Sequence, residues 1–221
     1  MLMPSNNLKP LVNDMEKLIA DERVDIHNVD IDKNFLAFTF MFKRKAPDLR
    51  YKVMLGMISN MIDDISDGLT KELRIDNSLI YSMNADYMLN RANSYLALYT
   101  EISSKNIKPC LDISLDYINR VIKDGFSVEQ FKKELEKDFY YWNTKVNNPN
   151  DLVQDLTRYR DYGKFVSDKD IHEVLQSVTL DEINATMREL FKDAKMHVFV
   201  YGNADKKDVY TIKQIQKRFH V

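Results

Sequence analysis

Apolar residues along this chain follow two spacings, and the shorter one predicts strands. Residues 35–42 form a nearly continuous aliphatic and aromatic run, which is typical of a well-buried strand. Across residues 79–87 the apolar positions recur at every second residue, which predicts a strand buried on one face. Turn residues at 90–93 lead into a further strand at 94–102, so we expect an antiparallel hairpin. A last strand is expected at 196–201.

Between these runs the apolar positions lie three and four residues apart, which predicts helices. Gly125 stands where a helix would need a cap with positive φ, and Ser127 with Gln130 and Thr179 with Glu182 form capping boxes. The expected helices cover residues 11–19, 49–65, 111–122, 131–146, 152–162, 167–176, 180–191 and 209–219. Strand, helices, hairpin, helices, strand is an α+β order. We therefore expect a single mixed or antiparallel sheet covered by helices on one face.

The length of 221 residues favours one large domain with a short appendage. Residues 5–8 lead into an apolar helix in the way that residues 202–205 do near the other end of the chain. If both segments are tails of the same fold, residues 1–30 are the tail of a preceding domain or a linker helix. Residues 31–221 then form one complete half-domain.

Charge and cysteine content narrow the function classes. The chain has 32 basic and 34 acidic residues without a long block of one sign, so neither nucleic acid nor a membrane surface is expected as a partner. Cys110 is the only cysteine, which excludes an internal disulfide, predicts a buried structural thiol and is consistent with a reducing compartment. No leader-like start and no long apolar run occur, so a cytoplasmic location is expected.

Residue patterns give no catalytic centre. A zinc peptidase needs two histidines close together on one helix, and neither His-Glu-x-x-His nor its inverted form occurs here. His172 with Glu173 is the nearest fragment, but no second histidine follows at ligand spacing. Phosphate-binding loops and nucleophile elbows are also missing, and we interpret Asp63 and Asp64 as surface charges. The sequence thus predicts no catalytic residue, no metal ligand and no cofactor in this chain.

One segment carries a resemblance. Residues 69–74, Leu-Thr-Lys-Glu-Leu-Arg, followed by residues 79–82, Leu-Ile-Tyr-Ser, resemble the part of the pitrilysin, insulinase and mitochondrial processing peptidase family in which a helix ending in Leu-Arg leads into a strand carrying a tyrosine. Arg74 and Tyr81 are the matching residues, seven positions apart. The order of elements over residues 35–205 is also similar to that family.

The resemblance implies a half-domain of the processing-peptidase type, the LuxS/MPP-like metallohydrolase fold. In that family an N-terminal half holds zinc through His-x-x-Glu-His, and a C-terminal half without metal contributes an arginine and a tyrosine to the peptide site. This chain then looks like the zinc-free half, with Arg74 and Tyr81 binding substrate and zinc held by a partner half or subunit. It would be part of a zinc-dependent endopeptidase and inactive alone.

Three alternatives stay open. Arg74 could pair with an acid at a helix end while Tyr81 packs under helices, which is a purely structural role. The family often has glycine where Ile80 stands and a glycine-rich turn where only Gly68 occurs, which favours a catalytically inactive structural or assembly subunit of the same fold. A free-standing peptide-binding module is the third possibility.

Overall fold

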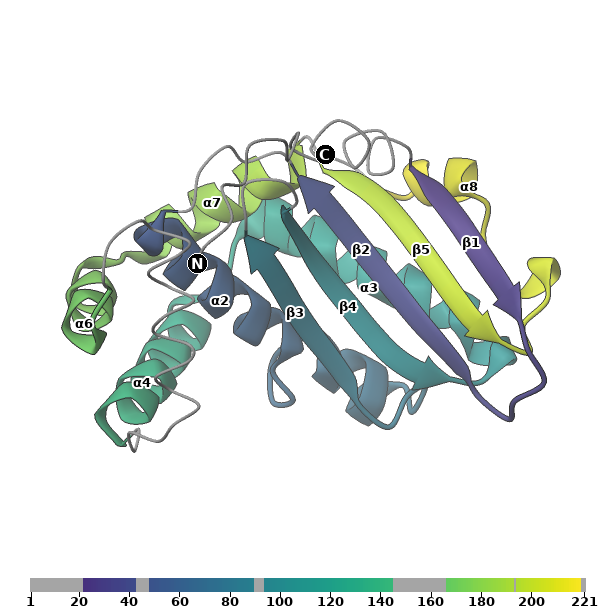
Figure 1. Ribbon diagram of the computed structural model, residues 1–221, viewed down its shortest axis with the longest axis horizontal. Helices are drawn as coiled ribbons and strands as arrows, with labels where there is room; N and C mark the ends of the chain where they lie inside the picture. The colour runs from purple at the N-terminus through teal and green to yellow at the C-terminus, as the bar shows by residue number, and fades with distance from the viewer. Residues whose placement is uncertain (1–21, 43–47, 90–93, 145–165, 193, 220–221) are drawn as a thin grey trace, which may run out of the picture.

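The computed structural model describes residues 22–42, 48–89, 94–144, 166–192 and 194–219. They form two layers, a five-stranded sheet and helices behind it (Figure 1). The strands are β1 (Arg23–Asn28), β2 (Asn34–Phe42), β3 (Met83–Leu89), β4 (Ser94–Ile102) and β5 (Lys195–Gly202). The α-helices are α2 (Leu49–Asp63), α3 (Ile107–Asp124), α4 (Val128–Thr144), α6 (Asp168–Ser177), α7 (Leu180–Lys192) and α8 (Ile212–Gln216). The predicted α+β class is confirmed.

The sheet is mixed, with strand order β1-β5-β2-β4-β3. β2 lies at its centre and pairs antiparallel with both β4 and β5, and β3 pairs antiparallel with β4. β1 is the exception, because it runs parallel to β5. The last strand in sequence therefore lies between the first two.

The core lies between the sheet and the helices. Side chains of a strand alternate between its two faces, and in β2 the buried apolar side chains are Leu36, Phe38 and Phe40. Phe40 has its ring centroid 4.6 Å from that of Phe191 in α7, in an edge-on contact. Phe35 points to the opposite face and is 38% exposed, and no described helix covers that face (Figure 1). Helices on one face only, as predicted, are confirmed.

The helix ends follow the capping residues. Ser127 Oγ accepts a hydrogen bond from the Gln130 amide at 3.1 Å, and the Gln130 side chain accepts one from the Ser127 amide at 3.0 Å. Thr179 and Glu182 make the same reciprocal pair before α7. Gly125 adopts φ 81° and donates its amide to the last turn of α3, a conformation that glycine adopts without steric cost. These predicted boundaries are confirmed.

The predicted strand at 79–87 begins too early, because β3 starts at Met83. The residues before it close the preceding helix instead. Ser78 has a positive φ of 52°, and the Leu79 amide donates to the Leu73 carbonyl at 2.9 Å. The Asn106 side chain donates to the Leu79 carbonyl at 2.9 Å. Both backbone groups of Leu79 are thus engaged away from any sheet partner.

At the N-terminal side, residues 23–28 form β1 and pair with β5. The predicted helix at 11–19, the turn at 90–93 and the helical segment at 152–162 lie outside the described residues. The domain boundary near residue 30 stays a prediction.

Candidate functional site

Arg74 lies near the end of a short helix that follows α2. Its last part, Lys71–Asp76, is π-helical, and Leu73 anchors it with a fully buried side chain. The charged neighbours of Arg74 are paired. Lys71 Nζ lies 2.7 Å from an Asp76 carboxylate oxygen, and Glu72 pairs with Arg120 of α3.

Tyr81 follows after the turn that ends this helix. Ile80 is buried beside it, so the backbone is fixed, while the Tyr81 side chain is 78% exposed. The Thr100 hydroxyl of β4 donates to the Ser82 carbonyl at 2.5 Å, which ties the segment to the sheet. Tyr81 therefore precedes β3 and does not belong to the strand, contrary to the prediction.

The two residues matched by the resemblance meet in space. The guanidinium carbon of Arg74 lies 4.8 Å from the centroid of the Tyr81 ring, within the range of a cation–π contact. Across the described ranges, no hydrogen bond or ion pair engages the Arg74 guanidinium. The structural alternative required an acid partner for Arg74 and a covered Tyr81, and the described residues provide neither.

The described residues do not fit a metal. Within residues 22–42, 48–89, 94–144, 166–192 and 194–219, no group of three or more His, Cys, Asp or Glu side chains could hold an ion. His172 packs against Phe139 with ring centroids 5.9 Å apart. His197 Nε2 lies 2.9 Å from an Asp25 carboxylate oxygen across the β1–β5 pair.

Cys110 is buried in α3, and burial raises the pKa of its thiol to about 12. A thiol with this pKa carries almost no thiolate at neutral pH and is a poor nucleophile. The predicted buried structural thiol is confirmed.

The interpretation of Asp63 and Asp64 as surface charges is wrong. The Asp64 side chain is only 8% exposed and accepts hydrogen bonds from Lys133 at 2.6 Å, from Lys137, and from the Ser66 amide and hydroxyl at 2.8 and 2.5 Å. Burial alone would raise its pKa, but these donors outweigh burial and hold the pKa well below its usual range. Asp63 accepts from Thr70 at 2.7 Å, and burial raises its pKa.

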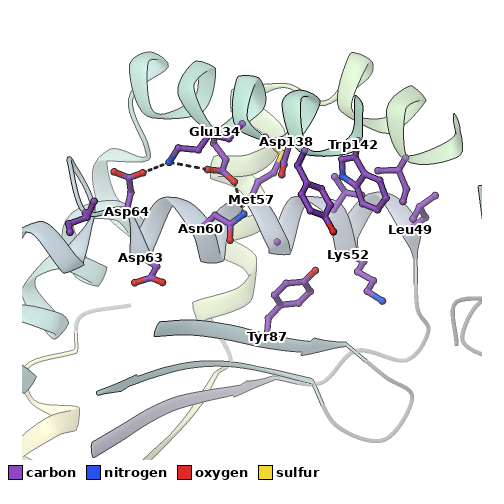
Figure 2. A pocket seen from close by; sticks show the side chains of 16 residues that line it. Leu49, Lys52, Met57, Asn60, Asp63, Asp64, Tyr87, Glu134, Asp138 and Trp142 are labelled. Carbon is purple, nitrogen blue, oxygen red and sulfur yellow. Dashed lines mark hydrogen bonds and ion pairs between the residues drawn. The ribbon is translucent and has the colours of Figure 1, made fainter. Parts of the chain in front are cut away.

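Sequence reasoning also missed two acids on α4. The predicted apolar face of this helix is only half-buried, whereas Glu134 is buried. Glu134 and Asp138 line a pocket with α2 and β3 (Figure 2). Their spacing of four residues on one helix was the available signal, because it places both carboxylates on one face.

Comparison with known proteins agrees with the fold and identifies the family. The family described as "Peptidase M16 inactive domain" matches residues 8–137, more than half of the chain. No curated protein matches. None of the helices in the described ranges has the length and apolar character needed to cross a membrane.

Solved structures share the fold at low identity. A putative M16-like peptidase from Alicyclobacillus acidocaldarius is 18% identical with a TM-score of 0.73, over 82% of this chain and 43% of that chain. The first half of the periplasmic protease PqqL from Escherichia coli is 12% identical with a TM-score of 0.70, over 90% of this chain and 47% of that chain. Complex III2 from Candida albicans is 12% identical with a TM-score of 0.73, over 90% and 50%. The chain spans half or less of the length of these structures. On the family match, the chain belongs to the M16 peptidases as their inactive domain, the C-terminal half of the pitrilysin and insulinase type.

Proposed function

We propose that this chain binds peptide substrate for a zinc site held by another domain or subunit. One observation carries the proposal, namely the Arg74 guanidinium stacked at 4.8 Å on the exposed Tyr81 ring without a carboxylate partner among the described residues. Arginines that only stabilise a fold are expected to pair with acids, as Arg120 does with Glu72 nearby. The Arg74 guanidinium is partly exposed and has no hydrogen-bond or ion-pair partner among the described residues, so it is available to a ligand.

The chemistry of the pair suits a peptide. The guanidinium presents five donors in a fixed fork that matches a carboxylate or two carbonyl oxygens, and the Tyr81 hydroxyl adds one donor. When water attacks a peptide carbonyl, negative charge develops on its oxygen, and fixed donors stabilise that charge. In the proposed assembly the zinc of the partner half would supply the activated water. Arg74 and Tyr81 would orient the peptide and stabilise the charge.

The test is the kinetics of Arg74→Ala in the protein assembled with its His-x-x-Glu-His half. A charge-assisted hydrogen bond to the transition state of about 1.5–3 kcal/mol predicts a fall in kcat/KM of roughly 10- to 150-fold. Arg74→Lys should recover only part of the loss, because lysine has no planar fork. Arg120→Ala, which removes a nearby arginine paired with Glu72, is the matched control and should change kcat/KM less than twofold. A change below twofold for Arg74→Ala would exclude the role.

The same assembled protein also tests the alternative, an inactive structural or assembly subunit. The likeness to Complex III2 concerns the fold alone. If the assembled protein cleaves no peptide from a mixed library although its zinc half binds metal, the structural reading replaces the proposal. The isolated chain should bind no zinc by elemental analysis and hydrolyse no peptide.

A further inference from the structure

A pocket of about 760 Å³ lies between α2, α4 and β3, and Ile171 of α6 also lines it. Figure 2 shows Tyr87 pointing from β3 toward the helices, and Glu134, Asp138 and Trp142 in succession along α4. These three α4 residues are four positions apart and so share one helix face. The α4 wall of the pocket therefore presents two carboxylates, Glu134 and Asp138, followed by the aromatic ring of Trp142.

Glu134 is buried with unused acceptor capacity. Its side chain is 3% exposed. One oxygen accepts a hydrogen bond from the Asn60 amide at 2.6 Å, while the other lies 3.9 Å from Lys137 Nζ, beyond hydrogen-bond distance. Burial raises the pKa of Glu134, which is the cost of holding a carboxylate with too few donors.

Asp138 stands one helical turn further along. In the part of the chain that the structure describes, no hydrogen bond or ion pair reaches its carboxylate. Burial, with the charge of Glu134 adding to it and Lys137 opposing it, raises the pKa of Asp138 to about 7. The pocket thus has a carboxylate on its wall that would be stabilised by an added cation.

The lysines at the pocket do not remove this imbalance. Lys137 and Lys133 both bind Asp64 at the far end of the pocket. Lys52 of α2 is the other cation in the lining. Asp63, Glu134 and Asp138 are three carboxylates against Lys52 and the one lysine charge that Asp64 does not balance, so one negative charge is left in excess.

The aromatic walls restrict the kind of cation. Tyr87, Tyr141 and Trp142 contribute ring surface to the lining. Gly56 keeps the space beside Tyr87 open, because a Cβ there would lie 3.1 Å from the Tyr87 hydroxyl oxygen. A small hydrated metal ion gains little from such walls, whereas a flat and weakly hydrated organic cation both stacks on rings and donates to carboxylates.

We propose that this pocket binds the guanidinium of an arginine side chain from a peptide, with Glu134 and Asp138 accepting its hydrogen bonds and the Trp142 ring contacting its flat face. The planar fork of guanidinium matches carboxylates more closely than the ammonium of lysine does. Neither Arg74 nor Tyr81 lines this pocket, so the site is separate from that pair.

Trp142 provides a direct readout, since it is the only tryptophan in the chain. Titration of the full chain with N-acetyl-arginine methylamide should change tryptophan fluorescence in a saturable way, with a dissociation constant on the order of 1 mM as expected for so small a ligand. The citrulline derivative has the same shape without the charge and should give no saturable change. Asp138→Asn should weaken arginine binding at least about fivefold, as loss of a charge-assisted bond predicts. Glu136→Gln, an exposed acid on the same helix, is the matched control and should leave the affinity within about twofold.

Acidity gives a second readout. Lowering the pH from about 8 to about 6 protonates Asp138 and should weaken binding by up to roughly tenfold. The other ionisable groups in the pocket lining are Lys52 and Asp63 of α2, Asp64 directly after α2, Tyr87 of β3, and Glu134, Lys137 and Tyr141 of α4. Asp138→Asn should lose most of the pH effect, which separates Asp138 from these groups.

The outcomes are decisive in each direction. Equal binding of the citrulline derivative, or no saturable change up to about 20 mM arginine derivative, overturns the proposal. Equal affinity for the corresponding lysine derivative overturns the choice of guanidinium. An equal loss in Glu136→Gln overturns the placement in the pocket. Since removal of an uncompensated carboxylate does not threaten folding, failure of Asp138→Asn to weaken binding is also a contradiction.

Discussion

The two ends of the pocket between α2 and α4 hold the same chemical group in opposite states. Asp64 at one end accepts hydrogen bonds from two lysines and from Ser66, and its pKa lies well below the usual range. Asp138 at the other end has no such partner among the described residues, and its pKa is raised to about 7. Both are enclosed by the same two helices. The difference indicates that the number of hydrogen-bond donors around a buried carboxylate, more than its depth of burial, decides whether the carboxylate stabilises or destabilises this fold.

The largest expected effect comes from breaking the satisfied end. Asp64→Asn removes the charge that holds Lys133 and Lys137 and should lower the free energy of unfolding by about 2–4 kcal/mol, below the usual range for a buried pair because the lysines are partly exposed. Urea denaturation at neutral pH measures this, with Asp116→Asn on the exposed face of α3 as control. If Asp64→Asn lowered the free energy of unfolding no more than Asp116→Asn does, the hydrogen bonds to Asp64 would not stabilise the fold.

The pH dependence of the same residue has a fixed sign. The folded pKa of Asp64 is lower than the unfolded value, so its stabilisation is present above the unfolded pKa of about 3.9 and is lost as pH falls through the folded pKa. Asp64→Asn should therefore differ from the unmodified chain at neutral pH and approach it in acid.

At Asp138, at the other end of the pocket, the pH dependence of stability has the opposite sign. The folded pKa of Asp138 exceeds the unfolded value, so the folded state binds more protons between about pH 4 and 7, and stability falls as pH rises through that window. Asp138→Asn should raise the free energy of unfolding by about 1–2 kcal/mol at about pH 8, after a discount for solvent screening. Thermal unfolding should show a gain of roughly 2–8 °C that shrinks toward about pH 5. A loss of stability at the higher pH would refute the assignment, and Glu136→Gln serves as control.

The smallest stability effect is expected at Arg74, outside the pocket. Its contact with the exposed Tyr81 ring is the only interaction of its guanidinium found in the described ranges, so Arg74→Ala should change the free energy of unfolding by less than about 1 kcal/mol. Arg50 is the matched contrast, because it binds Glu182 at 2.7 Å and the Ser177 carbonyl at 2.9 Å between α2 and α7. Arg50→Ala should cost about 1–3 kcal/mol in the same denaturant titration. If Arg74→Ala and Arg50→Ala lowered the free energy of unfolding equally, Arg74 would have a structural role like that of Arg50.

The sequence predicted elements well where the signal is local. The alternation in β2 and the capping boxes before α4 and α7 are each set by residues within a few positions of one another. The start of β3 was misjudged because the Leu79 amide bonds to Leu73 and its carbonyl accepts from Asn106, and the second of these partners lies 27 positions away. The spacing of apolar residues carries no information on a distant side chain that takes up a backbone hydrogen bond.

The pocket could not be predicted from the sequence for a related reason. Asp64 and Lys133 are 69 positions apart, and only the packing of α4 on α2 brings them together. Glu134 was not singled out in the sequence, and its hydrogen bond from Asn60 of α2, 74 positions away, forms only when the two helices pack. By contrast, the contact between Arg74 and Tyr81 lies within one short segment, and its two members were identified from the resemblance alone.

The place of β5 in the sheet has a consequence for how the chain folds. During synthesis β1 and β2 emerge early, but the strand that separates them is completed only at Gly202. Until then β1 has no partner strand and β2 presents one unpaired edge. Closure of the sheet must therefore be a late step that joins residues about 170 positions apart, as in the pairing of Arg23 with His197. Chains released before residue 195 should persist as aggregation-prone intermediates.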